Sequence, residues 1–276
     1  MSAEVARLRS MLGDALANPQ DISSPHGEPL LADRAPSSFG HTLACLAKGL
    51  HLLEGRTAAD FGAASGFVAA VAGVAAKGLV VWIAEALCRR EAGALYGPGL
   101  VEFGIDPDRM LFVEAPGSRD VLWAVEQAVT SAAVGAVVGE VYGGRGVDLT
   151  ATRRIALRSE QAGRPAYLLS CGDDVGATAA RTRWRVAPAA SHSSLAPTLL
   201  GQPTWSLDLV KSRFGPCAHH LVSFCPRTRR FVEVQPAPRA GALAATPRQG
   251  ARVVARQGVV PLEALRRRLD KTDPRG

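Results

Sequence analysis

Residues 57–85 read TAADFGAASGFVAAVAGVAAKGLVVWIAE, and their pattern decides the fold class. We expect TAADF to be a strand, the following stretch with Gly and Ser to be a tight turn, and residues 65–77 to be a helix. The last eight residues, GLVVWIAE, are apolar along most of their length, which is typical of a strand covered on both faces of a sheet. The stretch therefore predicts a β–α–β unit with parallel strands.

The same alternation continues towards the C-terminus. We predict helices over residues 87–104, 118–131 (with Ser118 as N-cap) and 148–163, and strands over residues 106–115, 133–141 and 164–171. After Cys171 apolar and polar residues alternate, as in WSLDLVKSR at 205–213, which is typical of antiparallel strands. The sequence thus predicts an α/β fold whose mostly parallel sheet has helices on both faces and antiparallel strands at one edge.

The chain divides into four segments by composition. Residues 1–18 form an amphipathic helix by their apolar spacing, and residues 19–40 are a linker rich in Pro and Ser. Residues 41–234 are the predicted α/β core. Residues 235–276 are rich in Pro, Ala, Gly and Arg without a period, so we expect them to be mostly disordered, with one short helix at 261–271.

Positive charge is concentrated at the C-terminal end. The chain has a net charge of +7, and from Arg227 onward it carries 12 Lys and Arg against 4 Asp and Glu, so the remainder is close to neutral. Two Arg clusters are candidate contacts to DNA or an acidic partner: Arg227, Arg229 and Arg230, and Arg266, Arg267 and Arg268. The alternative is a solvated end without a specific partner.

Cysteine use and hydropathy bear on compartment and metal content. The five cysteines form no CxxC pair, and no apolar run is long enough to span a bilayer, so we expect a reduced, cytoplasmic protein that does not bind membranes. His219 and His220 lie near Cys217 and Cys225, but their spacing matches no common zinc pattern. We therefore expect no metal site.

The glycines after TAADF suggest an incomplete phosphate loop at Gly62, Ser65 and Gly66. A complete loop has four residues between its glycines, then Lys for the phosphates and Ser or Thr for Mg²⁺. Here three residues separate the glycines, and Phe67 and Val68 occupy the positions of Lys and Ser/Thr. We therefore expect neither ATP nor Mg²⁺ as a cofactor, although a backbone nest could still hold an anion weakly.

Two acidic residues end predicted strands, Glu85 after LVVWIA and Glu140 after AVVG. The carboxyl ends of parallel strands line the ligand crevice of such sheets, so both are catalytic candidates if the protein hydrolyses ATP. The alternative is that each acid caps a strand, paired with Arg89 or Arg145.

The order of these pieces resembles the RecA-type ATPase core, and three segments are more closely similar to the inducible mutagenesis protein A (ImuA) family, which is RecA/SulA-like. The segments are LYGPGL at 95–100, DLTATRRIAL at 148–157 and AARTRWRV at 179–186. The resemblance covers about residues 41–226. It implies a RecA-like P-loop-type core.

Carried over by position, the resemblance puts Gly62, Ser65 and Gly66 at the phosphate loop. Glu85 takes the place of the catalytic Glu, and Glu140 that of the acidic residue of the Walker B strand. The loop is degenerate because Phe67 and Val68 stand where the family pattern has Lys and Ser/Thr, so the resemblance does not imply ATP hydrolysis.

The resemblance also implies a function. Proteins of this family are accessory factors of damage-induced (SOS) error-prone translesion DNA synthesis. The implied partners are a Y-family-like polymerase homologue (ImuB-type) and an error-prone DnaE-type polymerase, with RecA and DNA as further partners. Two alternatives stay open, an active RecA-type DNA-dependent ATPase and a SulA-like inhibitor of cell division.

Overall fold

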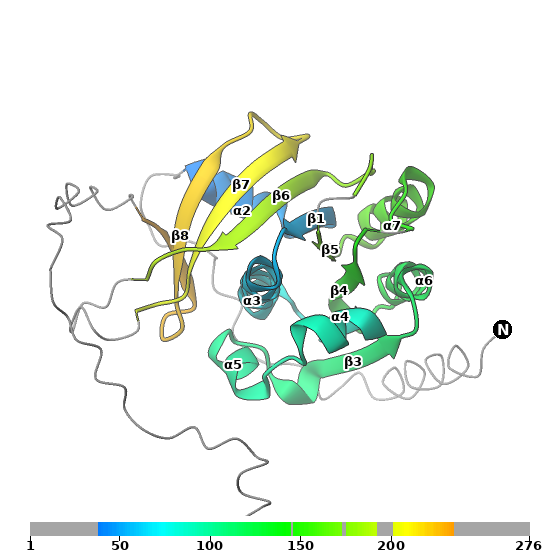
Figure 1. Cartoon of the computed structure of the whole chain (residues 1–276), viewed down its shortest axis with the longest axis horizontal. Coiled ribbons are helices and arrows are strands. Elements are labelled where there is room, and N and C mark those ends of the chain that lie inside the picture. The colour runs from blue at the N-terminus through cyan, green and yellow to red at the C-terminus, as the bar shows by residue number, and fades with distance from the viewer. Residues whose placement is uncertain (1–37, 145, 173–174, 192–200, 235–276) are drawn as a thin grey trace, which may run out of the picture. The chain divides into compact units, whose positions relative to one another are not determined.

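The computed structural model describes residues 38–144, 146–172, 175–191 and 201–234 (Figure 1). These residues belong to one compact unit of the chain, Met1–Gln235. The predicted N-terminal helix, nearly all of the predicted linker and the tail from residue 235 lie outside the described residues.

Helices and strands alternate through the first two thirds of the described chain. The helices are α2 (Ser38–Cys45), α3 (Ala58–Ala75), α4 (Ala86–Ala92), α5 (Gly97–Glu102), the 3-10 helix η2 (Pro107–Arg109), α6 (Ser118–Ala128) and α7 (Leu149–Ala162). The strands are β1 (Gly49–Gly55), β2 (Leu79–Glu85), β3 (Met110–Ala115), β4 (Val134–Tyr142), β5 (Pro165–Cys171), β6 (Thr182–Pro188), β7 (Thr204–Ser212), β8 (His219–Cys225) and β9 (Arg230–Glu233).

All nine strands form one sheet in the order β3-β2-β4-β5-β1-β6-β7-β8-β9. The strands from β3 to β6 in this order pair in parallel, and β7, β8 and β9 continue the sheet in antiparallel pairs. This confirms the predicted α/β fold with a mostly parallel sheet and an antiparallel edge. β6 differs from the prediction because it is parallel to β1, so the antiparallel part begins only at β7.

The two faces of the sheet bury two separate hydrophobic clusters. Successive residues of a strand point to opposite faces, so Leu53 and Trp82 pack with α3 while Leu52 and Val81 pack with α6 and α7. Helices α2, α3 and α5 lie on one face, and α6 and α7 lie on the other (Figure 1). The prediction of helices on both faces is confirmed.

Helix α3 is the central helix of its face. It is rich in Ala and Gly, which lets it pack closely against the sheet, and residues 67–72 are all buried. At Gly73 an added Cβ would lie 2.2 Å from the carbonyl oxygen of Phe103, so only glycine fits where α3 meets the end of α5. Within the part of the chain that the structure describes, α3 is also the one helix long and apolar enough to cross a membrane.

The prediction of a strand at residues 57–61 and a turn at 62–64 is wrong, because the helix predicted from Ser65 begins already at Ala58. The first strand is GLHLLEG at Gly49–Gly55, and TAADFGAASG belongs to α3 and its N-cap. Thr57 and Asp60 form a capping box: the Thr57 hydroxyl accepts the Asp60 N–H at 3.2 Å, and the Asp60 carboxylate accepts the Thr57 N–H at 3.1 Å. This box starts the helix, and the Ala-rich run behind it favours helix over strand.

Smaller corrections concern helix ends. The helix predicted over residues 87–104 is two helices, separated where Gly93 adopts a φ of 86°, and the Gly97-Pro98 pair begins the second of them, α5. Ser118 is the first residue of α6, not its cap, and α2 begins at Ser38, inside the predicted linker. Gly163, at the end of the predicted helix, closes α7 in the left-handed conformation.

Candidate functional site

The connection between β1 and α3 lies where the resemblance to a RecA-type core would place a phosphate loop. It consists of Arg56 and Thr57 alone, and an added Cβ on Gly55 would lie 2.4 Å from the Phe61 nitrogen, so the strand end abuts the first turn of the helix. The carbonyl and hydroxyl oxygens of Thr57 accept the N–H groups of Phe61 and Asp60. The Asp60 carboxylate adds negative charge at the helix N-terminus, which opposes a phosphate there.

The residues predicted as the loop therefore lie inside a helix. Gly62, Ser65 and Gly66 occupy the second and third turns of α3, where their backbone groups are part of the helix. The prediction of a phosphate-loop conformation at these positions is wrong, because the capping box starts the helix before them.

The three residues nevertheless share a pocket with one of the predicted acids. The pocket has a volume of about 330 Å³ and lies between α3, the connection from α4 to α5, and α5 itself. Gly62, Ser65 and Gly66 line one wall, Phe103 lines the opposite wall, and Glu140 from the end of β4 also contributes. The lining is mainly apolar.

Glu140 is the one acidic group of this pocket among the residues that the structure describes. Its side chain is buried, and its Oε1 accepts a hydrogen bond from the Ser65 hydroxyl at 3.1 Å. Burial raises the pKa of the Glu140 carboxyl to about 7, and the hydrogen bond from Ser65 opposes this rise in part. The carboxyl therefore changes its charge near neutral pH.

Glu85 has a different position from Glu140. Its Oε2 accepts the backbone N–H of Tyr142 at 2.9 Å, so the carboxylate caps the end of the neighbouring strand β4. Arg89 does not pair with it but with Glu114, at 3.0 Å, and Arg145 lies outside the described residues. The structure thus gives Glu85 a capping contact and does not place it in the pocket.

Cys88 on α4 lies near both acids. Burial is the main cause that raises the pKa of its thiol, and the nearby carboxylates of Glu140 and Glu85 raise it further. A thiol in such surroundings stays protonated and is a poor nucleophile.

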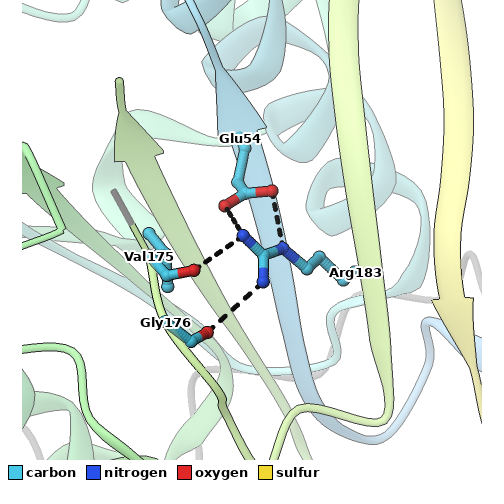
Figure 2. A network of polar contacts seen from close by, with 4 residues as sticks. All are labelled: Glu54, Val175, Gly176 and Arg183. Carbon is cyan, nitrogen blue, oxygen red and sulfur yellow. Dashed lines mark hydrogen bonds and ion pairs between the residues drawn. The ribbon is translucent and has the colours of Figure 1, made fainter. Parts of the chain in front are cut away.

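Sequence reasoning missed a buried ion pair at the end of β1. Figure 2 shows Arg183 of β6 reaching Glu54 of β1 with two hydrogen bonds, Nε to Oε2 at 2.7 Å and an Nη to Oε1 at 2.5 Å. The same guanidinium donates to the carbonyl oxygens of Val175 and Gly176 at 2.8 and 3.3 Å. The pair joins two adjacent strands to the loop between β5 and β6, and it commits this arginine to a structural role.

Sequence reasoning also missed a polar chain around His51, which is fully buried on β1. The Trp184 indole N–H donates to the Thr182 hydroxyl oxygen at 2.8 Å, the hydroxyl donates to His51 Nδ1 at 2.7 Å, and His51 Nε2 donates to the Lys48 carbonyl at 3.0 Å. Burial is the main cause that lowers the pKa of His51 to about 4. The imidazole is therefore neutral at physiological pH.

The predicted basic clusters fall in two parts of the chain. Arg227 and Arg229 are exposed on the turn between β8 and β9, and Arg230 begins β9 and is half-buried. The cluster Arg266–Arg268 lies outside the described residues. The described cluster thus presents two exposed side chains on one hairpin, and that of Arg229 lies against Gly104.

The histidines on β8 are engaged with acids. His219 Nδ1 lies 2.6 Å from Asp208 Oδ1, and His220 Nδ1 lies 2.8 Å from Glu233 Oε1. In the described ranges, no group of three or more His, Cys, Asp and Glu residues is placed to hold a metal ion.

The chain is similar to known proteins over about half of its length. No family model matches the chain. The chain is 34% identical over 148 residues to Protein ImuA of Caulobacter vibrioides, in strains NA1000 / CB15N and ATCC 19089 / CIP 103742 / CB 15. The matched segment is 50% of this chain and spans 57% of the length of each relative. This similarity supports membership of the ImuA family, which the sequence motifs predict.

Proposed function

We propose that this protein is an accessory factor of damage-induced, error-prone translesion DNA synthesis that uses a RecA-like core as a scaffold and does not hydrolyse ATP. The similarity to Protein ImuA suggests a role in the mutagenic response to DNA damage. The observation that carries the scaffold proposal is the two-residue connection from β1 to a capped α3, which leaves no loop for a phosphate.

The order of elements supports a RecA-like origin of the core. β1 leads directly into α3, β2 ends at Glu85, β4 carries Glu140 near its end, and antiparallel strands close the sheet. This is the order of pieces that the resemblance to the RecA-type core implies.

The charges around the core argue against a nucleoside triphosphate. Such a ligand needs convergent N–H groups and a cation to hold its phosphates. Here Asp60 stands at the start of α3, and Glu140 lies in the adjacent pocket. None of the described residues that line this pocket is Lys, Arg or His.

The proposed partners are the Y-family-like polymerase homologue (ImuB-type) and the error-prone DnaE-type polymerase in the cytoplasm, with RecA and DNA as further partners. The family resemblance supports these partners. The exposed Arg227 and Arg229 on the β8–β9 turn fit a polyanion or an acidic protein surface.

Co-purification tests the partner proposal. The full chain, mixed with each polymerase in turn, should elute as a stable complex in size-exclusion chromatography at moderate salt. If neither polymerase co-elutes with the chain, while a cell-division protein does, the SulA-like alternative is correct and our proposal is wrong.

Two binding experiments test the rest. Calorimetry with Mg²⁺ and ATP should show no binding. Tight binding that the pocket variant Gly66→Asp abolishes would overturn the proposal of a core without a nucleotide site and favour the ATPase alternative. Fluorescence anisotropy with single-stranded DNA should show binding that weakens with salt. Replacing both Arg227 and Arg229 by Ala should reduce it, whereas the control Arg153→Ala on the exposed side of α7 should not. An equal loss in the control would remove the hairpin from the DNA proposal.

A further inference from the structure

We propose that the pocket between α3 and α5 binds a small organic cation, a positively charged head on a short apolar body, with its head against Glu140. This inference goes beyond the proposed function and does not depend on it. It rests on the shape of the pocket, on its single buried carboxyl group and on the kinds of residue that surround that group.

The shape comes from glycines on one helix. Gly62 has no atom within 4 Å of an added Cβ, and at Gly66 an added Cβ would only touch the rings of Phe103 and Trp205 at 3.7–3.8 Å. The missing side chains leave a hollow of about 330 Å³. Pockets for small ligands start at about 300 Å³, so the space suits one small molecule or one long side chain.

The lining has the composition of a ligand site. Its walls are apolar, with Leu100 and Phe103 from the region of α5 facing the glycine side of α3. Polar groups are few and lie together, since Ser65 donates to Glu140. Apolar walls with a few placed polar groups are typical of small-molecule pockets, in which the polar groups fix the orientation of the ligand.

The charge determines which ligand fits. A buried carboxylate is costly unless a cation or several donors pair with it. Glu140 is 6% exposed; the Ser65 hydroxyl donates to it, and the nearby Trp82 indole N–H on β2 also favours its charged form. A carboxylate accepts up to about four hydrogen bonds, so N–H groups of an amidinium or ammonium head have acceptor sites left to use.

Other ligand classes fit the pocket less well. A phosphate or carboxylate would be repelled by Glu140. A divalent metal ion such as Ca²⁺ takes about six to eight oxygen ligands, and the carboxylate of Glu85 is already committed to the backbone of Tyr142. An uncharged apolar molecule would fill the hollow but would leave the carboxylate unpaired.

Binding of a cation at Glu140 should be linked to the release of a proton, so its affinity should depend on pH. Because the pKa of Glu140 is about 7, a cation that pairs with the carboxylate must displace a proton from part of the molecules at neutral pH. Binding should therefore release protons and be tighter at pH 8.5 than at pH 5.5.

Benzamidine and benzamide provide a matched pair of probes, alike in size but different in charge. By ligand-observed NMR titration at pH 8.5, benzamidine should bind at least about tenfold more tightly than benzamide, the gain of a charged over a neutral pairing. At pH 5.5 the ratio should fall at least about fivefold. Equal binding of the two probes at pH 8.5 would overturn the proposal.

Three variants test whether the preference for the charged probe comes from Glu140 and whether the probe binds in the hollow beside Gly62. Glu140→Gln should abolish the preference for the charged probe, and Glu102→Gln, which removes an exposed carboxylate from the end of α5, should leave it unchanged. Gly62→Leu should fill the hollow and weaken both probes while leaving Glu140 in place. A charge preference that survives in Glu140→Gln, or tight binding in Gly62→Leu, contradicts the proposed site.

The same chemistry could come from a free small cation or from an Arg side chain of a polypeptide. A blocked Gly-Arg-Gly peptide, compared with Gly-Gln-Gly, distinguishes the two sources. Tighter binding of the Arg peptide than of benzamidine assigns the pocket to a polypeptide, and the reverse order assigns it to a free cation. Binding of neither probe overturns the proposal, and it leaves the polymerase co-purification result unaffected.

Discussion

Replacing Glu140 by Gln should stabilise the protein at alkaline pH and have little effect at acidic pH. The carboxyl of Glu140 is buried, and its pKa is raised from 4.5 to about 7 by that burial. A group whose folded pKa is raised contributes its full stability below the unfolded pKa and loses it as the pH rises through the folded pKa. The loss therefore falls between pH 4.5 and about 7.

The magnitude follows from the same two pKa values. Each pKa unit corresponds to about 1.4 kcal/mol, so the charged Glu140 lowers the free energy of unfolding by about 3 kcal/mol above pH 7. Gln keeps the size of the side chain and can still accept the hydrogen bond of Ser65, but it never becomes charged. Urea unfolding should show the variant more stable by up to about 3 kcal/mol at pH 8.5 and within about 1 kcal/mol of the parent at pH 4.5.

The comparison between parent and variant removes other titrating groups, because both proteins contain them. The exposed Glu102→Gln serves as a control and should change stability by less than about 0.5 kcal/mol at either pH. If the Glu140→Gln difference is the same at pH 4.5 and pH 8.5, or if the variant is less stable at pH 8.5, burial does not disfavour the charge and the reasoning is wrong.

Three further predictions concern the core. Gly73→Ala should lower the free energy of unfolding by more than about 2 kcal/mol, because the added methyl would lie 2.2 Å from the carbonyl oxygen of Phe103. Gly62→Ala on the same helix meets no atom and should raise the free energy of unfolding by about 0.5–1 kcal/mol. Equal effects of the two variants in urea unfolding would contradict this prediction. The pKa of His51 is about 4 in the folded protein, below its value of 6.5 in the unfolded chain. As the pH falls from 6.5 to 4, protonation of His51 should therefore lower the free energy of unfolding by up to about 3 kcal/mol. His51→Gln should be less stable than the parent at pH 7 but should lose less stability than the parent over this pH range. Arg183→Met should lower the free energy of unfolding by about 3–5 kcal/mol in thermal or chemical unfolding, because it leaves the buried Glu54 carboxylate without a counter-charge. Adding Glu54→Leu should recover most of this loss. A double variant as unstable as the single one would show that the contacts of Arg183 to the β5–β6 loop contribute more than the ion pair does.

The parts of the fold that local pattern could predict are those whose burial is uniform. β2, β4 and β5 are covered on both faces, so their sequences are apolar along most of their length and predict strands. β7 has one buried face, and its Trp205, Leu207 and Leu209 alternate with exposed residues as predicted. In both cases the order of apolar and polar residues along the strand follows directly from which faces of the strand are buried.

β1 shows why the rest could not be predicted. Its sequence, GLHLLEG, contains a His and a Glu in a fully buried strand. They are tolerated because Thr182 and Arg183, on a strand about 130 residues later, provide the hydrogen bonds and the counter-charge. No local pattern reveals such partners, so the sequence pattern favours TAADF as the strand instead.

The candidate site shows a second limit of local sequence pattern. Gly62, Ser65, Gly66 and Glu140 do line one pocket, but as a helix face opposite a strand end and not as a phosphate loop. The Thr57-x-x-Asp60 capping box was the local signal that could have placed the helix start correctly. The pocket itself depends on how α5 packs, which the sequence pattern does not specify.

The capping of α3 sets a condition on any attempt to build a nucleotide enzyme on this scaffold. Point substitutions would not suffice, because a lysine in place of Phe67 would enter an aromatic cluster with Trp205 and Phe231, where the Phe67 side chain is 0% exposed. The two-residue connection would have to be lengthened first, and the helix shortened by about as much. The scaffold is therefore separated from nucleotide chemistry by an insertion in its backbone, and no single codon change crosses that distance.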